Sequence, residues 1–455
     1  MTATRWVTLM LRQCKYAFLA ILVLISVGWL YLQTGRSRPN VLVILLDTLR
    51  ADHLGMYGYE RDTSPFLDSF AAQNVKFNFA VTAAPWTPPS VASIFTGKYP
   101  VSHGFFPPNS RETAKSDHSV LSTAHQTLAE IFQAHGYVTA AVSPNPWITK
   151  EFNFDQGFQD FVYLPRAPAQ KINDAAQELL GKFRSQDKPF FLYLHYLDPH
   201  DPYSPPDPYR SLYSGKLSKG DYSEEMLQKI GLYDGEIRYL DDALKNLFAD
   251  LQKDGLLEDL VVVIVGDHGE QFNEHGFLTH GNTVFNVETH VPLIVKFGRN
   301  SPQSIIDHPV STIDIFPTLL KAADIDPPAE PTLALPLLDY VRHVERGGVM
   351  SRISRKLQQR AFVNFQGKKL IVGGTQMGEM LQDDDPYSNI VGVFDSRSDA
   401  DEKTPLASYA KLSELQESMQ QTLKVAEELS VRNSESERPL SEDSIEQLRS
   451  LGYLN

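Results

Sequence analysis

The sequence predicts an α/β protein in which a large, mostly parallel sheet is covered by helices on both faces. Two observations predict this class. Continuous runs of Val, Ile and Leu are typical of strands buried on both faces, and amphipathic helical stretches separate those runs. The 455 residues suffice for one large domain with a smaller appendage. A net charge of −14 without a sustained basic run argues against nucleic acid as a partner.

The first element is an apolar, uncharged run from Tyr16 to Gln33. A membrane-spanning helix needs about 17–25 such residues, so residues 16–34 are predicted to form a single-pass transmembrane anchor. A slight excess of basic residues before the run places residues 1–15 in the cytoplasm and the remainder in the periplasm or outside the cell. A cleaved signal peptide is the alternative, but no convincing Ala-x-Ala site follows the run.

Strands and helices are predicted to alternate through the main domain, residues 39–345. The strand patterns are Val41–Leu46, Tyr137–Ser143, Phe190–Leu197, Leu260–Val265 and Val291–Phe297. The helical patterns between them are Thr123–Ala134, Ile172–Arg184 and Glu224–Lys253. Because continuous apolar strands alternate with helices, the strands are expected to be mostly parallel.

The remaining residues, 346–455, are predicted to form a small antiparallel subdomain with a helical tail. From about Gln359 the strand patterns become short and alternating, at Ala361–Phe365, Lys369–Val372 and Val391–Asp395. Two helical patterns follow, at Lys411–Leu429 and Ser441–Leu451.

Candidate metal ligands follow three of the predicted strands. Functional groups of a parallel sheet gather beyond the carboxyl ends of its strands. Asp47 directly follows the first strand, Asp267 and His268 follow the strand at Leu260–Val265, and His200 lies just past the strand at Phe190–Leu197. One such acid could simply cap a helix, but the set together predicts a site for one divalent ion such as Ca, Mn or Zn.

Thr87 is a candidate nucleophile at the start of a helix. It precedes Pro88, Pro89 and an apolar helical run, so it is expected to cap that helix. A hydroxyl there lies in the positive field of the helix N-terminus, which stabilises an alkoxide and a bound anion. Capping alone explains the local sequence, and a catalytic role requires Asp47 and Asp267 to lie nearby.

Five segments in order resemble the sulfatase family of the alkaline-phosphatase superfamily. They are Pro39–Asp47, Ser90–Gly97, Pro199–Tyr203, Gly266–Glu270 and Asp314–Thr318. The resemblance runs from about Pro39 to the end of the chain. It implies an alkaline-phosphatase-like sandwich with a small C-terminal sheet and a sulfatase-like catalytic domain over residues 39–345.

The sequence departs from the pattern of that family at the site itself. Sulfatases carry a Cys or Ser, matured to formylglycine, within Cys/Ser-x-Pro-x-Arg, whereas the aligned stretch here is Thr87–Val91. Threonine cannot give the formylglycine aldehyde, so no formylglycine is expected, and Val91 replaces the usual arginine. The paired Asp-Asp of the family is Asp47-Thr48, its Lys-x-His motif reads Ser143–Trp147, and His280 stands where a lysine is usual.

The residues that remain resemble the single-metal site of lipoteichoic acid synthases and phosphoethanolamine transferases, which use a threonine nucleophile. Carried over by position, the metal ligands would be Asp47, Thr87, Asp267 and His268. Thr87 would attack in line. His200 and His280 would bind the oxygens of the anion or protonate the leaving group. Asn145 is a weaker candidate for substrate binding, as is His275.

The predicted function is therefore a membrane-anchored, metal-dependent hydrolase or transferase that acts on phosphate or sulfate esters through a threonine. Phosphate is chemically favoured, because a phospho-threonine can be hydrolysed by attack at phosphorus. The alternatives are a true sulfatase without formylglycine and an inactive sulfatase-like fold that serves as an envelope binding or scaffold protein. An extracytoplasmic location suggests an envelope glycan or lipid as substrate.

Overall fold

The computed structural model describes residues 38–105, 120–215, 217–218, 220–353, 358–374, 389–430 and 440–450. Residues from Asn40 onward form one compact unit. The predicted membrane segment at residues 16–34 lies outside the described residues. Within the described part of the chain, no helix has the length and apolar character needed to cross a membrane.

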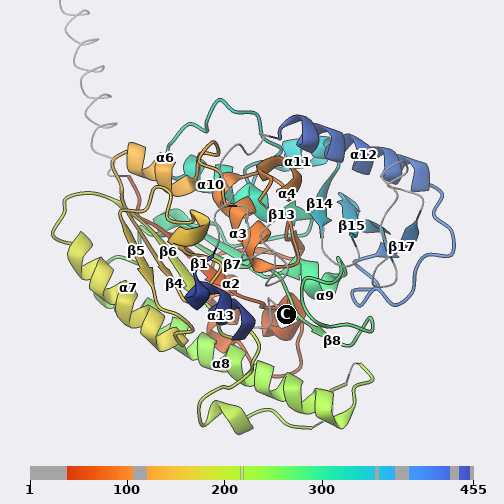
Figure 1. Cartoon of the computed structure of the whole chain (residues 1–455), viewed down its shortest axis with the longest axis horizontal. Coiled ribbons are helices and arrows are strands. Elements are labelled where there is room, and N and C mark those ends of the chain that lie inside the picture. The colour runs from red at the N-terminus through yellow and green to blue at the C-terminus, as the bar shows by residue number, and fades with distance from the viewer. Residues whose placement is uncertain are drawn as a thin grey trace, which may run out of the picture. The chain divides into compact units, whose positions relative to one another are not determined.

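The centre of the domain is an eight-stranded sheet (Figure 1). In spatial order its strands are β12 (Ser304–Ile306), β2 (Val75–Phe77), β11 (Leu293–Phe297), β7 (Val261–Gly266), β1 (Val41–Leu46), β6 (Phe190–Tyr196), β4 (Val138–Ser143) and β5 (Asp160–Tyr163). The five strands from β7 to β5 are parallel to one another, as predicted. Strand β11 runs antiparallel to both of its neighbours.

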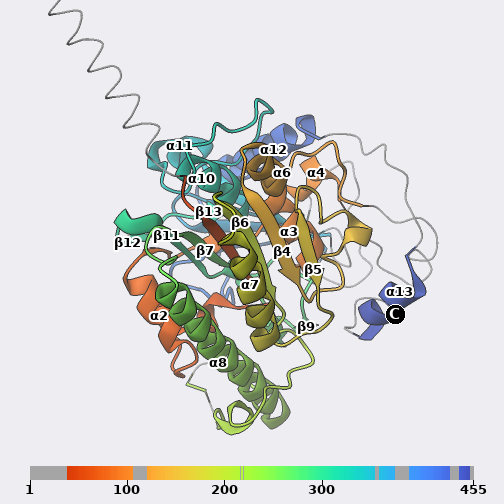
Figure 2. The same ribbon diagram turned by 90° about the vertical axis from the view of Figure 1, so that its left-hand side faces the viewer.

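Helices cover both faces of this sheet (Figures 1 and 2). Alternate residues of β1 explain why: Val41, Val43 and Leu45 face one hydrophobic core, and Leu42, Ile44 and Leu46 face the other. The first core is completed by α3 (Thr87–Thr96), α6 (Leu128–Ala134) and α10 (Ile315–Ala322). The second is completed by α2 (Pro65–Ala72), α7 (Ala169–Phe183) and α8 (Glu224–Lys253). All residues of β1 are buried, which accounts for its continuous apolar sequence.

Three of the predicted elements begin or divide differently in the structure. The helix expected from Ile172 begins three residues earlier, at Ala169, directly after Pro168. The helix expected from Thr123 begins at Leu128, because Thr127 and Glu130 form a reciprocal capping box through their side chains and backbone N–H groups. The strand expected at Val291–Phe297 is divided by Pro292, which has no N–H group to donate. Its two parts are β10 (His290–Val291), which pairs with β3, and β11.

The C-terminal residues form the predicted antiparallel sheet, which has one strand more than the sequence indicated. Its order is β14 (Gly348–Arg352), β15 (Arg360–Asn364), β16 (Lys368–Val372) and β17 (Ile390–Asp395). Helix α12 (Leu412–Glu428) packs on it, and α13 (Glu442–Ser450) adds Ile445 and Leu448 to the first core. On β16, Lys369 is fully buried and its Nζ lies 2.9 Å from Glu402 Oε1 and 2.9 Å from Asn286 Oδ1, which ties this sheet to the main domain.

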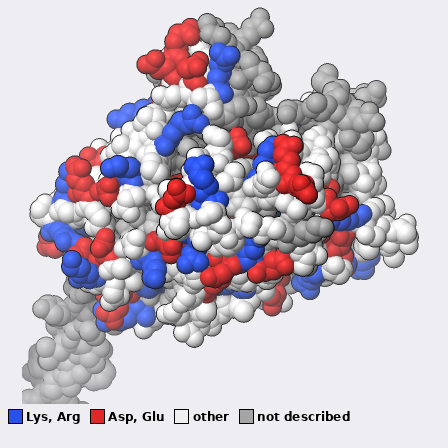
Figure 3. Space-filling model, turned by 90° about the horizontal axis from the view of Figure 1, so that it is seen from below, with Lys and Arg blue, Asp and Glu red and all other residues white. Residues whose placement is uncertain are grey.

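Short elements complete the described residues. Strands β3 (Ala80–Val81), β10 and β13 (Val310–Ser311) form one small sheet, and β8 (Gln271–Phe272) and β9 (Leu278–Thr279) form another. The short helices are α4 (Pro100–His103), α9 (Asn286–Thr289) and α11 (Tyr340–Arg346). The surface seen from below Figure 1 intersperses acidic and basic side chains, and its described residues present no continuous basic area (Figure 3).

Candidate active site

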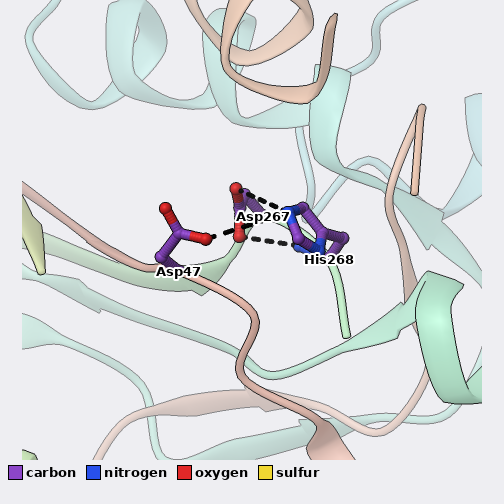
Figure 4. Close-up of side chains that lie close together, drawn as sticks. All are labelled: Asp47, Asp267 and His268. Atoms are coloured by element: carbon purple, nitrogen blue, oxygen red, sulfur yellow. Dashed lines mark hydrogen bonds and ion pairs between the residues drawn. The ribbon is translucent and has the colours of Figure 1, made fainter. Parts of the chain in front are cut away.

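Asp47, Asp267 and His268 meet at the carboxyl edge of the central sheet (Figure 4). Strands β1 and β7 are adjacent and parallel, with Leu46 opposite Gly266, so the residues that follow them emerge side by side. One ligand atom from each of the three side chains lies within 4.8 Å of the others, and all three residues are buried. The sequence prediction that these groups converge therefore agrees with the geometry.

Three atoms of this cluster point their lone pairs at a common space. Asp267 Oδ1 accepts the N–H groups of Thr48 (3.1 Å) and His268 (2.9 Å), whereas Asp267 Oδ2 and Asp47 Oδ1 are buried and have no hydrogen-bond donor among the described residues. His268 Nδ1 donates to the Gly269 carbonyl (2.9 Å), which leaves the lone pair on Nε2, 3.3 Å from Asp267 Oδ2 and 3.8 Å from Asp47 Oδ1.

These donors fit a divalent cation. A buried carboxylate oxygen without a partner is costly, and two of them side by side repel each other. Burial raises the pKa of Asp267 well above its ordinary value, and the neighbouring Asp47 carboxylate raises it further. Burial lowers the pKa of His268, which favours its neutral, metal-binding form. Two carboxylate oxygens and one imidazole nitrogen are a donor set that suits Zn, Mn or related ions.

Asp47 is held by partners on its other oxygen. Its Oδ2 accepts hydrogen bonds from Asn145 Nδ2 (2.7 Å) and His195 Nε2 (2.8 Å). Burial by itself raises the pKa of Asp47, but the hydrogen bond from His195 and the surrounding histidines outweigh it, so the pKa of Asp47 lies below its usual range. Asp47 is therefore anionic and fixed in orientation, with Oδ1 directed toward His268.

Thr87 belongs to the cluster but does not cap its helix. The N-cap of α3 is Trp86, Thr87 is the first helical residue, and no capping bond forms, so the predicted capping role is wrong. Pro88 and Pro89 fix the first turn without any N–H groups that the Thr87 side chain could satisfy. The hydroxyl instead donates to His268 Nε2 at 3.1 Å. Ser90 Oγ donates to the Asp267 carbonyl (2.8 Å), which holds α3 against the end of β7.

His200 and His280 extend the cluster as a row of imidazole rings. The ring centroids of His268 and His280 are 4.4 Å apart, and those of His280 and His200 are 5.0 Å apart. His280 Nδ1 lies 3.2 Å from Glu270 Oε1, and Tyr203 donates to Glu270 Oε2 (3.0 Å). Burial raises the pKa of Glu270 to about 8. Both predicted leaving-group histidines thus lie beside the candidate metal ligands.

The two weaker candidates lie elsewhere in the network. Both polar ends of the Asn145 amide are used within the protein, since Nδ2 binds Asp47 and Oδ1 accepts the Trp147 N–H (2.9 Å). A contact between Asn145 and substrate remains a prediction, and it would require one of these bonds to break. His275 stacks on Phe285 with 3.7 Å between ring centroids.

Sequence reasoning missed His195. It lies in β6, where its Nε2 binds Asp47 and Tyr193 Oη contacts its Nδ1 at 3.0 Å. The residue is completely buried in an otherwise apolar and aromatic strand, FFLYLHY. A lone titratable group inside a buried parallel strand needs a polar partner, and that requirement is the signal that could have identified it.

The fold and the site together define a class of protein. A mostly parallel sheet brings two buried acids, an imidazole and a hydroxyl to its carboxyl edge, where α/β enzymes gather their functional groups, and this set of donors fits a divalent ion. The family model described as Sulfatase matches residues 39–325. The chain therefore belongs to the sulfatase family, as the sequence resemblance predicted.

Curated relatives agree with this membership. The ulvan-active sulfatase of Formosa agariphila is 26% identical in an alignment 334 positions long, which covers 65% of this chain and 64% of that protein. An uncharacterized sulfatase of Escherichia coli strain K12 is 24% identical in an alignment 394 positions long, which covers 72% of this chain and 76% of that protein. The chain thus spans about two thirds to three quarters of the length of these relatives.

Solved structures show the same fold. The crystal structure of Ps i-CgsB in complex with k-i-k-neocarrahexaose has a TM-score of 0.66 at 18% identity and covers 91% of this chain and 98% of that one. The phosphonate monoester hydrolase of Agrobacterium radiobacter has a TM-score of 0.64 at 18% identity, with coverages of 86% and 95%. At 18% identity, these neighbours show that the chain shares their fold.

Proposed function

We propose that this protein is a membrane-anchored hydrolase that cleaves phosphate or sulfate esters with Thr87 as nucleophile. The observation that carries the proposal is the 3.1 Å contact between Thr87 Oγ1 and His268 Nε2, beside Asp47 Oδ1 and Asp267 Oδ2, to which no described residue donates a hydrogen bond. A hydroxyl that only stabilised the helix would bond to the backbone of its own first turn, and this one does not.

Each residue of the site has a separate role in the proposed reaction. Thr87 Oγ1 forms the new bond to phosphorus or sulfur and releases its proton to water, while the bond to the alcohol oxygen breaks. His200 or His280 gives that oxygen a proton as the alcohol leaves. Water then cleaves the threonine ester and restores the hydroxyl. A divalent cation held by Asp47, Asp267 and His268 would lower the pKa of the hydroxyl and neutralise charge on the ester oxygens.

Phosphate is favoured over sulfate on chemical grounds. An ester between threonine and phosphate can be hydrolysed by attack at phosphorus, whereas sulfatases release sulfate from a formylglycine hydrate, which threonine cannot form. The phosphonate monoester hydrolase among the structural neighbours shows that the fold is compatible with phosphorus chemistry. The ulvan-active relative supports a glycan as the alcohol part. An envelope glycan is therefore the proposed natural substrate, with a lipid as the alternative.

The test uses the full chain in detergent with Mn, Zn or Ca supplied in turn. Aryl phosphate monoester, phosphate diester, phosphonate monoester and sulfate ester substrates are compared for the wild type, Thr87→Ala and Thr87→Ser. We expect the wild type to cleave a phosphorus ester only when metal is present. Thr87→Ala should lose activity by on the order of 1,000-fold or more, as variants of catalytic nucleophiles do. Thr87→Ser, which keeps a hydroxyl, should retain partial activity. Thr96→Ala makes the same substitution at the other end of α3, away from the cluster, and serves as the matched control.

A second readout identifies the covalent step. Mass spectrometry of the enzyme quenched during turnover of a slow phosphate ester should find the added phosphoryl group on the peptide that contains Thr87. A preference for the sulfate ester would instead establish the second candidate, a true sulfatase without formylglycine, which the names of the relatives favour. Wild-type protein that binds no divalent metal and cleaves none of the four esters would identify a binding or scaffold protein.

A further inference from the structure

Beside the catalytic cluster, the structure has a cavity of about 170 Å³. Its wall is formed by residues that follow β1, by the turn after β8 and by the loop around Lys403. At about 30 Å³ per molecule the cavity has room for about six waters, roughly the bulk of one sugar ring. None of the described residues that line it is a candidate metal ligand, and Thr87 is not among them either. The cavity is therefore separate from the reaction centre.

His53 places a nitrogen without a partner on the wall of this cavity. The residue is 4% exposed, and its Nδ1 lies 2.7 Å from Asp234 Oδ1. Because a carboxylate oxygen accepts, Nδ1 carries the proton, and the lone pair of the neutral ring is on Nε2. Nε2 hydrogen-bonds to no described residue, and the ring lines the cavity. A buried imidazole nitrogen in this position is a site for a ligand that donates a hydrogen bond.

The surroundings of His53 hold its ring in place before any ligand arrives. Asp234 Oδ2 accepts hydrogen bonds from Tyr59 Oη and Arg61 Nη1, both at 2.7 Å, so the acid that orients the imidazole is itself fixed. The rings of Tyr233 and Phe272 pack on His53 with centroid distances of 5.1 and 5.9 Å. A side chain that is already fixed loses little conformational entropy when it binds a ligand.

The charged groups of the wall are paired with one another. Arg50 donates to both oxygens of Asp52 (2.8 and 2.7 Å) and also pairs with Glu274. Lys403 Nζ lies 3.2 Å from Asp401 Oδ2. A charged ligand would have to separate one of these pairs, and that is costly for a cation as buried as Arg50. The wall therefore favours a neutral ligand, to which the 47% exposed carboxylate of Asp52 still offers lone pairs.

Three half-buried tyrosine rings, those of Tyr57, Tyr59 and Tyr222, complete the wall. Their hydroxyls are used within the protein: Tyr57 donates to the Phe77 carbonyl (2.9 Å), for example, and Tyr222 donates to Glu274 (3.0 Å). These bonds fix the rings. The C–H groups of a sugar ring pack on aromatic carbon, and its hydroxyls bond to carboxylates and imidazoles. A sugar matches each kind of group that the wall presents.

We propose that this cavity binds one neutral sugar unit of a glycan, with one hydroxyl donating to His53 Nε2 and another to Asp52. The site lies close to the reaction centre, because Arg50 on its wall also donates to the Glu270 carbonyl (3.0 Å), and Glu270 contacts His280. The link to the substrate rests on the proposed function, since a glycan held here keeps its esters near the catalytic cluster. The inference favours the glycan over the lipid as the natural substrate.

The test measures binding of sugars that carry no ester. The full chain, in a detergent without a sugar headgroup, is titrated calorimetrically with neutral hexasaccharides of glucose, galactose and xylose. His53→Phe keeps a ring and leaves Asp234 with Tyr59 and Arg61, but it removes the acceptor, so binding should weaken by about tenfold or more. His53→Gln, whose amide can donate to Asp234 and accept from the sugar, should recover part of the affinity.

His290→Phe is the matched control, because His290 is a partly buried histidine that does not line the cavity. It should bind the hexasaccharide as the wild type does. Urea unfolding of each variant shows that it is folded.

The other results would overturn the inference. No binding of any of the three hexasaccharides would remove the sugar as ligand, and equal affinity in the wild type and His53→Phe would place the sugar elsewhere. Binding of choline or of a sulfated hexasaccharide, but of no neutral one, would make the cavity a site for a charged ligand. Because no ester is cleaved in this titration, the Thr87 mechanism can fail while the sugar site stands, and the reverse.

Discussion

The orientation of Asp47 depends on two residues that are not among the candidate metal ligands. His195 and Asn145 both donate to its Oδ2, which leaves Oδ1 as the oxygen that faces His268. Partners of this kind orient a ligand, and their loss typically costs 10–100-fold in metal affinity, roughly 1.4–2.7 kcal/mol. We expect His195→Ala to weaken Mn or Zn binding by about 10–100-fold.

Calorimetric titration of the full chain with each metal measures that loss. His195→Gln, whose amide can still donate, should recover part of the affinity, and His135→Ala at the exposed end of α6 should leave it unchanged. Wild-type affinity in His195→Ala would show that Asn145 alone fixes Asp47.

The sequence could predict Asp47, Asp267 and His268, because each follows a recognisable apolar strand. It could not predict the role of His195, since that role depends on β6 pairing with β1, a long-range contact that no local pattern encodes.

At the scale of the elements, Lys369 helps attach the C-terminal sheet to the main domain. It is a buried cation on β16, and its ion pair with Glu402 connects the C-terminal sheet to α9 through Asn286. Removal of one partner of a buried pair leaves the other charge without compensation and costs about 3–5 kcal/mol. We expect Lys369→Met to lower the free energy of unfolding by that amount in urea titrations. The double variant Lys369→Met with Glu402→Gln should recover much of the loss, and a double variant as unstable as the single one would contradict this account.

The elements themselves were largely predictable where hydrophobic periodicity is strong. Strand β1 and helix α8 have the predicted bounds, and β4, β6, β7 and β15 to β17 differ from theirs by about one residue at either end. The misses have local physical reasons: a capping box shortens α6, and a proline divides β10 from β11. Strand β14 was not predicted, because its sequence, GVMSR, carries little alternation. The antiparallel direction of β11 depends on its connection to β7 and not on its own residues.

At the scale of the whole domain, a pair of buried acids joins α8 to the loop that carries His200. Asp198 and Glu236 are hydrogen-bonded to each other, and Glu236 Oε1 also accepts the Ser204 N–H (2.7 Å). Burial raises the pKa of Asp198 to about 6. Burial, the neighbouring Asp198 charge and their hydrogen bond raise the pKa of Glu236 to about 8. The pair therefore shares a proton at neutral pH in the folded protein.

This shared proton makes the stability of the domain depend on pH with a definite sign. An unfolded chain releases the Glu236 proton near pH 4.5, whereas the folded chain keeps it up to about pH 8. Between these values the folded state binds more protons, so stability falls as pH rises, by up to about 1.4 kcal/mol per pH unit for one proton.

Glu236→Gln keeps the oxygen that accepts the Ser204 N–H but cannot ionise, so its stability relative to wild type should increase from pH 5.5 to pH 8. Urea unfolding of the full chain at several pH values measures the difference, with the exposed Glu417→Gln on α12 as control. A constant difference between wild type and Glu236→Gln across this range would mean that the two acids do not share a proton.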